Sequence, residues 1–150
     1  MLLDKFNTFA DGTSVGTPNS TVVNVGEVID LGVARNLGES PLWLVIQVTT
    51  AITSGGAATV SFALSSDAQA AIAVDGTETR HIETDVIAKA TLVAGYQMAI
   101  PLPKENPVYE RYLGFQVREN GGNVLTAGNV NAFLTTDPQS WKAYAAATGE

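Results

Sequence analysis

The strongest strand pattern in the chain is Leu42-Trp43-Leu44-Val45-Ile46-Gln47-Val48-Thr49-Thr50. Successive side chains of a strand point to opposite faces, so its alternate apolar residues fall on one face; these are Leu42, Leu44, Ile46 and Val48. A Ser54-Gly55-Gly56 turn follows, and Thr59-Val60-Ser61-Phe62-Ala63-Leu64-Ser65 then repeats the alternation. Two alternating runs joined by a glycine-containing turn predict a β-hairpin with one apolar face.

Further short segments bounded by turn residues have the same character. They are residues 21–25, 27–33, 79–84, 96–102, 111–118 and 129–136. Pro101 lies near the end of one of them, where a strand end or a sheet edge accepts a proline. Together with the hairpin, these segments predict an all-β domain of about eight antiparallel strands, a jelly roll or β-sandwich. An up-and-down barrel is the competing topology.

The start of the chain differs from residues 21–136, which we expect to form the jelly-roll domain. Residues 1–20 are predicted to form an extended N-terminal arm, because Gly12, Gly16 and Pro18 interrupt any helical period. The apolar residues of this arm need a cover, on the domain itself or on a neighbouring molecule. They are Leu2, Leu3, Phe6 and Phe9.

The end of the chain, residues 137–150, is predicted to form a short helix or tail. Asp137 suits an N-cap and Pro138 suits the first helical position, and Trp141 and Tyr144 then share one face. A helix of fewer than about 12 residues is marginal alone, so we expect this segment to dock on another surface.

The charge of the chain argues against nucleic acid and membrane as partners. Its 150 residues include 15 acidic and 8 basic side chains, which gives a net charge of −7, and the basic residues form no run. Nucleic acids and anionic membranes are bound mainly through lysine and arginine. The chain begins without the apolar segment of a signal peptide and contains no run of about 20 apolar residues, so we expect a soluble protein that is not exported.

Few residues are equipped for catalysis or metal binding. The chain has no cysteine and one histidine, His81, and it has no Gly-x-Ser-x-Gly motif. On a strand, His81, Glu83 and Asp85 would share one face and could hold a cation, but no second histidine supports such a site. An exposed, solvated strand face is the simpler interpretation. We therefore expect a protein that is not an enzyme and that carries no cofactor or metal.

Trp43 lies on the strand face opposite Leu42, Leu44 and Ile46. Either both faces of the sheet are covered at this point, or Trp43 anchors a contact with another protein, since aromatic residues are enriched at interface hot spots. Packing within the domain is the simpler interpretation, and the apolar arm and the aromatic tail add weight to the second.

Several segments resemble capsid cement proteins, also called decoration proteins, of short-tailed double-stranded DNA bacteriophages. The likeness runs nearly from end to end. It is carried by Met1-Leu2-Leu3-Asp4-Lys5-Phe6-Asn7-Thr8-Phe9, Thr53-Ser54-Gly55-Gly56-Ala57-Ala58-Thr59-Val60, Thr91-Leu92-Val93-Ala94-Gly95-Tyr96, Glu110-Arg111-Tyr112-Leu113-Gly114 and Asn131-Ala132-Phe133-Leu134-Thr135-Thr136-Asp137-Pro138.

The resemblance implies a jelly-roll subunit that is made in the host cytoplasm and joins the virion as a structural protein. It implies a homotrimer on the outer capsid surface, bound to the major capsid protein between capsomers and stabilising the shell, with no active site. Our hypothesis for the interface comprises Leu2, Leu3, Phe6, Phe9, Trp43, Trp141 and Tyr144. Deleting residues 1–10 should then weaken retention on the capsid and leave the domain folded.

The alternative is a carbohydrate-binding or receptor-binding jelly-roll module. Such a module needs exposed aromatic side chains on one concave face, and Trp43, Tyr96 and Tyr112 are the candidates. Glycan binding that is lost in Trp43→Ala would favour this alternative.

Overall fold

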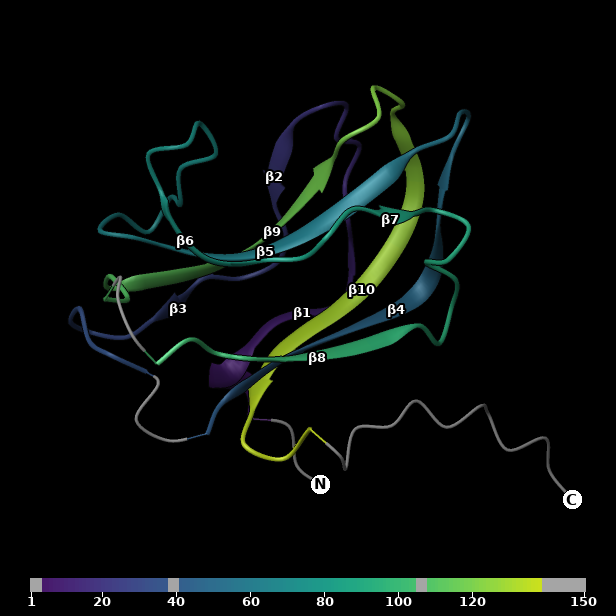
Figure 1. Ribbon diagram of the computed structural model, residues 1–150. Coiled ribbons are helices and arrows are strands. Elements are labelled where there is room, and N and C mark those ends of the chain that lie inside the picture. Colours follow the sequence, from purple (N-terminus) through teal and green to yellow (C-terminus); the bar gives the residue numbers. More distant parts are fainter. Residues whose placement is uncertain (1–3, 38–40, 105–107, 139–150) are drawn as a thin grey trace, which may run out of the picture.

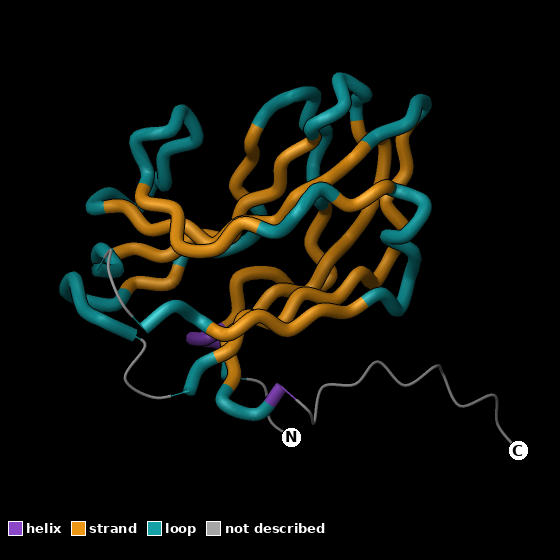
Figure 2. Tube along the Cα trace, in the orientation of Figure 1, coloured by secondary structure: helices purple, strands orange, loops and turns teal. Residues whose placement is uncertain are grey.

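The computed structural model describes residues 4–37, 41–104 and 108–138, and these residues are almost entirely strand and loop (Figures 1 and 2). One short 3-10 turn, η1 (Lys5–Asn7), precedes ten strands. The strands are β1 (Thr8–Ser14), β2 (Val22–Asn24), β3 (Ile29–Asp30), β4 (Trp43–Ser54), β5 (Thr59–Asp67), β6 (Thr79–Glu83), β7 (Ile87–Ala88), β8 (Gln97–Pro101), β9 (Tyr112–Glu119) and β10 (Leu125–Thr135). The chain is therefore an all-β protein.

The strands form two antiparallel sheets. The first sheet has the order β1-β10-β4-β8. The second sheet has the order β2-β9-β5-β6, with β3 also paired to β9 and β7 also paired to β5. Most neighbours in the sheets come from distant parts of the sequence, as the pairing of β1 with β10 illustrates, and β5 with β6 is the one pair of consecutive strands among the described residues. This order excludes the up-and-down barrel, in which consecutive strands pair.

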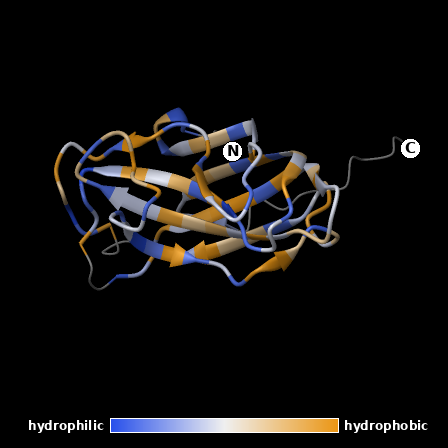
Figure 3. Cartoon of the chain, turned by 90° about the horizontal axis from the view of Figure 1, so that it is seen from above, coloured by the Kyte–Doolittle hydropathy of each residue, from blue (hydrophilic) through white to orange (hydrophobic). Residues whose placement is uncertain are grey.

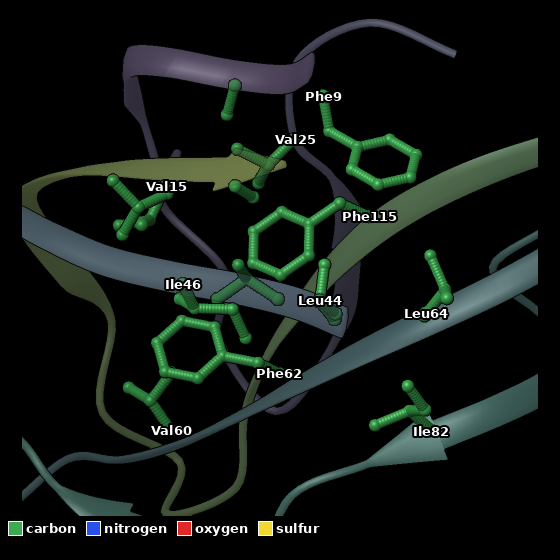
Figure 4. Packing of buried hydrophobic residues seen from close by; sticks show 14 of the residues in the cluster. Phe9, Val15, Val25, Leu44, Ile46, Val60, Phe62, Leu64, Ile82 and Phe115 are labelled. Carbon is green, nitrogen blue, oxygen red and sulfur yellow. The ribbon is translucent and has the colours of Figure 1, made fainter. Parts of the chain in front are cut away.

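A hydrophobic core joins the two sheets (Figure 4). Leu44 and Ile46 come from β4 in the first sheet, and Phe62 and Phe115 come from β5 and β9 in the second. The rings of Phe62 and Phe115 stack with centroids 5.9 Å apart. Each such side chain contributes about 1.5–3 kcal/mol to the stability of the fold when it is buried. Hydrophobic and hydrophilic residues alternate along the strands (Figure 3).

The predicted hairpin between β4 and β5 is wrong, although both of its strands exist. β4 pairs with β10 and β8, whereas β5 pairs with β9 and β6. The turn between them carries the chain from one sheet to the other, so that their apolar faces meet across the core instead of lying side by side. Alternation specifies which side chains point inward, but it does not specify the strand that accepts the hydrogen bonds.

The prediction that residues 1–20 form only an extended arm needs a correction, because residues 8–14 are strand β1. This strand pairs with β10 through a register that shifts between Thr8 and Ala10 and again between Ala10 and Thr13. Gly12, with φ of 58°, lies in the second irregular stretch, so it accompanies a bulge instead of ending the strand. Phe9 is 1 % exposed and belongs to the core.

The other predicted segments each contain a strand. The eight expected strands correspond to β2–β6 and β8–β10, and the chain adds β1 and β7. Pro101 is the last residue of β8, which is an edge strand, as predicted. The short helix predicted over residues 137–150 lies, beyond Pro138, outside the described residues.

Candidate interaction surfaces

An exposed aromatic ring lies on a hydrogen-bonded turn before β1. The side chain of Asp4 accepts a hydrogen bond of 2.9 Å from the backbone N–H of Phe6 and one of 3.3 Å from Nδ2 of Asn7. The hydroxyl of Thr8 donates to the Asp4 carbonyl at 3.0 Å. The side chain of Phe6 is nevertheless 86 % exposed. The turn therefore presents a preorganised apolar group to solvent.

This turn lies at the same end of the first sheet as Trp43. The η1 turn contacts β10, and Thr8 is paired in register with Phe133 of that strand. Phe133 is in turn paired with Val45 of β4, which follows Trp43 by two residues. Strands β1 and β4 run in the same direction because each is antiparallel to β10. Thr8, Phe133 and Val45 thus form one row across the sheet. Phe6 lies two residues before Thr8, and Trp43 lies two residues before Val45. We call this end of the sheet the Phe6–Trp43 surface.

The structure tests the two interpretations of Trp43. Alternation places Trp43, Val45 and Phe133 on the face of the sheet opposite Leu44 and Leu134. On this outer face Val45 and Phe133 are 0 % and 1 % exposed, whereas Trp43 is only partly buried. Both faces of the sheet are therefore covered at Val45, whereas Trp43 keeps part of its surface exposed.

A row of amide side chains borders this apolar region. Asn131 Nδ2 donates to Gln47 Oε1 at 3.3 Å, and Gln47 Nε2 donates to Gln97 Oε1 at 3.3 Å. Asn131 Oδ1 also accepts from the backbone N–H of Gly12 at 2.6 Å. These bonds cross β10, β4 and β8, so the outer face changes from apolar to polar two residues beyond Val45 and Phe133.

The remaining residues of the predicted interface have two outcomes. The prediction that Phe9 belongs to the interface is wrong, because Phe9 packs in the core and offers no surface to a partner. The register shifts of β1 place Phe9 and Ala10 inward together, which an arm with no strand pairing would not do. Leu2, Leu3, Trp141 and Tyr144 lie outside the described residues.

His81 is part of the packing between β5, β6 and the chain before β9. Its Nε2 is 2.7 Å from the hydroxyl of Ser66, and its ring stacks on Tyr109 with centroids 3.9 Å apart. Ser66 Oγ accepts the backbone N–H of Glu110 at 3.1 Å, so the hydroxyl proton is left to donate to Nε2. Burial lowers the pKa of His81 from 6.5 to about 4, and the ring is neutral at pH 7.

The prediction that His81 shares one face with Glu83 and Asp85 is wrong. The register between β5 and β6 shifts between Leu64 and Ser65, and this bulge breaks the alternation at His81. Glu83 instead forms an ion pair of 3.0 Å with Arg80 on the outer face. Within residues 4–37, 41–104 and 108–138, no group of three or more histidine, aspartate or glutamate side chains is arranged to hold a metal ion.

The aromatic residues of the carbohydrate-binding alternative do not meet on one face. Trp43 belongs to the first sheet and Tyr112 to the second, while Tyr96 packs against the core. The guanidinium of Arg111 lies 4.9 Å from the ring centroid of Tyr112. It also pairs with Asp30 at 2.9 Å, and this hydrogen bond is the largest of the effects that lower the pKa of Asp30 to about 2.

Sequence reasoning missed a cavity on the outside of the second sheet. Its volume is about 490 Å³, and Arg80 of β6 and Arg118 of β9 contribute to its lining. The available signal was the alternation of β9, in which Leu113, Phe115 and Val117 point inward and Arg118 therefore points outward. The walls come from loops, whose approach to the sheet no local pattern predicts.

Comparisons with known proteins identify one family. The family model described as Bbp16 matches residues 9–134, which span β1 to nearly the end of β10. The search of the curated proteins gave no match. In the described part of the chain, no helix has the length and apolar character needed to cross a membrane. Because the matched residues make up most of the 150-residue chain, this protein belongs to the Bbp16 family.

Proposed function

We propose that the protein is a capsid decoration protein, a structural component of a bacteriophage head that binds the outer surface of the shell and stabilises it. The proposal rests on the resemblance of the sequence to phage cement proteins. It also rests on one structural observation, the exposed ring of Phe6 on a turn that Asp4 holds in place. The major capsid protein and further copies of the chain are the proposed partners, in a homotrimer.

The strand order supports a jelly roll as the detailed fold. β2 and β3 both pair with β9, and β6 and β7 both pair with β5, so each pair acts as one interrupted strand. Eight strands then remain, numbered here along the chain. Their order is 1-8-3-6 in one sheet and 2-7-4-5 in the other. This is the order expected when two Greek keys are wrapped into facing sheets.

The Phe6–Trp43 surface suits docking better than catalysis. Burying an exposed aromatic side chain in an interface contributes about 1.5–3 kcal/mol. The hydrogen bonds that the Asp4 carboxylate accepts order the turn before binding, so little conformational entropy is lost when Phe6 is buried. An anchor of this kind on one end of a sheet fits a protein that bridges shell subunits.

Stabilisation of the shell then follows from mass action. A protein that binds the assembled lattice and not the separate subunits shifts the equilibrium toward the lattice. Several identical contacts around a closed oligomer add avidity. The net charge of −7 disfavours electrostatic binding to the genome, which agrees with a place outside the shell.

The first experiment measures the copy number of the chain on purified particles. A fixed ratio to the major capsid protein, equal to one or to a simple fraction, supports a lattice component. A few copies per particle would indicate a tail or receptor-binding module, and absence from particles would contradict both virion roles.

A set of variants then locates the contact. Phe6→Ala and Trp43→Ala should each weaken binding to particles about tenfold to a hundredfold, which corresponds to the loss of one buried aromatic group. Val86→Ala is the matched control, because Val86 is 59 % exposed and lies between β6 and β7 in the other sheet. Equal occupancy of Phe6→Ala and the control would exclude the Phe6–Trp43 surface.

A further inference from the structure

Two asparagines of the chain are followed by a residue that favours spontaneous deamidation. Gly121 follows Asn120 and Ser20 follows Asn19, and no other asparagine precedes a glycine or a serine. In this reaction the backbone nitrogen of the following residue loses its proton and attacks the side-chain amide carbon, and the amide group leaves as ammonia. Water then opens the resulting succinimide to aspartate or isoaspartate. A small following residue favours the attack, because it leaves the nitrogen accessible and the backbone free to bend.

Both attacking nitrogens are held by one carboxylate. Glu119 Oε1 accepts the N–H of Gly121 at 2.6 Å, and Glu119 Oε2 accepts the N–H of Ser20 at 3.0 Å. Hydrogen bonds to a charged acceptor are stronger than those between neutral groups. Glu119 is 0 % exposed, so water does not compete for its oxygens. The same side chain therefore restrains two reactive dipeptides that lie far apart in the sequence.

The amide group under attack is also held at Asn120. Its Nδ2 donates to Ser61 Oγ at 3.1 Å and to the carbonyl of Arg118 at 3.4 Å. The backbone N–H of Asn120 donates to the carbonyl of Thr59 at 2.9 Å. Ser61 is 3 % exposed and belongs to β5, so the amide is tied to the sheet. These bonds restrict the rotation that brings the amide carbon against the following nitrogen.

The carboxylate of Glu119 acts as a restraint and not as a base. A backbone N–H is a far weaker acid than a carboxylic acid, so a carboxylate does not remove the proton that the attack must release. The bond to Glu119 also fixes Ser20 at φ of 50°, a conformation that serine seldom adopts. Deamidation therefore requires local opening of the turn, and the hydrogen bonds to Glu119 keep the open population low.

We propose that Asn120-Gly121 and Asn19-Ser20 are latent deamidation sites that the buried carboxylate of Glu119 keeps closed. Asn120-Gly121 is the more reactive of the two once opened, since glycine is smaller than serine. Deamidation of Asn120 places a second negative charge next in sequence to Glu119, and the isoaspartate product adds an extra carbon to the backbone of the turn. Damage at Asn120 therefore weakens the bonds that hold Asn19-Ser20 closed.

The test compares the native protein with Glu119→Gln during storage in mildly alkaline buffer. Peptide mapping by mass spectrometry follows each asparagine, because deamidation raises the mass by about 1 Da. Asn120 should deamidate at least about tenfold faster in the variant, and Asn19 should also react faster, because the turn opens more often. Ile46→Val is the control for general destabilisation, since Ile46 is buried in β4 of the other sheet. It should leave both rates at their native values.

Three results would contradict the proposal. Equal rates in the native protein and in Glu119→Gln would mean that the carboxylate protects neither asparagine. Slower deamidation in Glu119→Gln would make Glu119 a base that promotes the reaction. Equal acceleration in Ile46→Val would assign the reaction to unfolding of the whole domain.

A measurement on the native protein alone covers the case in which Glu119→Gln does not fold. Asn120 should deamidate at least about a hundredfold more slowly in buffer than in concentrated urea, where the turn is open. Similar rates in the two solutions would show that the fold gives no protection and would overturn the proposal. Neither experiment involves particles, so a failure here would leave the proposed decoration function standing.

Discussion

At the scale of single residues, the carboxylate of Glu119 binds the backbone of several residues at once, and no local sequence pattern predicts these hydrogen bonds. It is 0 % exposed and accepts backbone N–H groups from Ser20, Gly121, Gly122 and Asn123 at distances between 2.6 and 3.2 Å. Burial raises the pKa of Glu119, but these hydrogen bonds lower it by more, so the carboxylate is charged in the folded protein. The turn after β9 is built around this charge.

We expect Glu119→Gln to lower the free energy of unfolding by about 1–3 kcal/mol at pH 7. One amide group must then face a backbone N–H, donor against donor, and the charge-assisted bonds are lost. Urea denaturation measures the change, with Glu27→Gln as the exposed control. Equal stability of the two variants would mean that the hydrogen bonds to Glu119 contribute nothing net.

Titration of His81 makes the stability of the folded protein depend on pH, in a direction that follows from its pKa. Its pKa is lowered from 6.5 to about 4, so the unfolded chain binds a proton more readily than the folded protein between these values. Stability is therefore complete above about pH 6.5 and falls as the pH drops toward 4, by up to about 1.4 kcal/mol per pH unit. The range from pH 6.5 to 5 lies above the usual titration of carboxylates.

Denaturation measured at several pH values should show this slope in the native protein. His81→Phe retains a ring that can stack on Tyr109 but has no titrating group, so its slope between pH 6.5 and 5 should be nearly flat. The comparison concerns the slope and not the stability at any one pH. An unchanged slope in the variant would assign the pH dependence to other groups.

At the scale of elements, the sequence predicted which residues are strands better than it predicted how the strands pair. The alternation of β4 and β5 correctly placed Leu44, Ile46, Phe62 and Leu64 in the core. The same pattern is satisfied by a hairpin and by two strands that face each other across a core. Strand pairing depends on distant segments such as β10, and a bulge of one residue was enough to reverse the predicted face of His81.

Strand β1 shows that sequence patterns also fail to specify strand pairing at the candidate interaction surface. Glycines suggested an arm, but pairing with β10 through shifted register makes residues 8–14 part of the sheet. Of the two phenylalanines predicted at the interface, Phe6 is 86 % exposed and Phe9 is 1 % exposed. No local feature distinguishes them, because the difference arises from where β1 begins.

This pair provides a matched prediction for β1. Phe9→Ala should lower the free energy of unfolding by about 3–5 kcal/mol, since it leaves a cavity in the core. Phe6→Ala should change it by less than about 0.5 kcal/mol. Thermal or urea denaturation of the two variants measures both. The structure also changes the expectation for deletion of residues 1–10, because that deletion removes Phe9 and should unfold or strongly destabilise the domain.

If Phe9→Ala were as stable as Phe6→Ala, β1 would not contribute to the core in solution. The informative deletion for capsid binding therefore stops before β1. Removing residues 1–6 takes away the exposed ring and leaves Thr8 and Ala10 in place to pair with β10.

At the scale of the whole molecule, the two sheets present different outer faces. The first has the Phe6–Trp43 surface, where exposed and partly buried aromatic groups precede a row of amide side chains. The second has a cavity lined in part by Arg80 and Arg118. A subunit that docks through the first sheet leaves the second accessible.

Because the protein has a net charge of −7, the effect of salt on its binding to particles distinguishes an apolar docking contact from an ionic one. Raising sodium chloride from about 50 to about 500 mM shortens the Debye length to a few ångströms and screens exposed charges. Contacts through Phe6 and Trp43 are not screened, and repulsion between neighbouring acidic subunits is relieved. We therefore expect occupancy on particles to stay constant or to rise slightly over this range, and ammonium sulfate to strengthen binding. Sedimentation of particles followed by quantification of the bound chain measures this. Release of the protein by sodium chloride would mean that ion pairs carry the contact and that the Phe6–Trp43 surface is not where the shell binds.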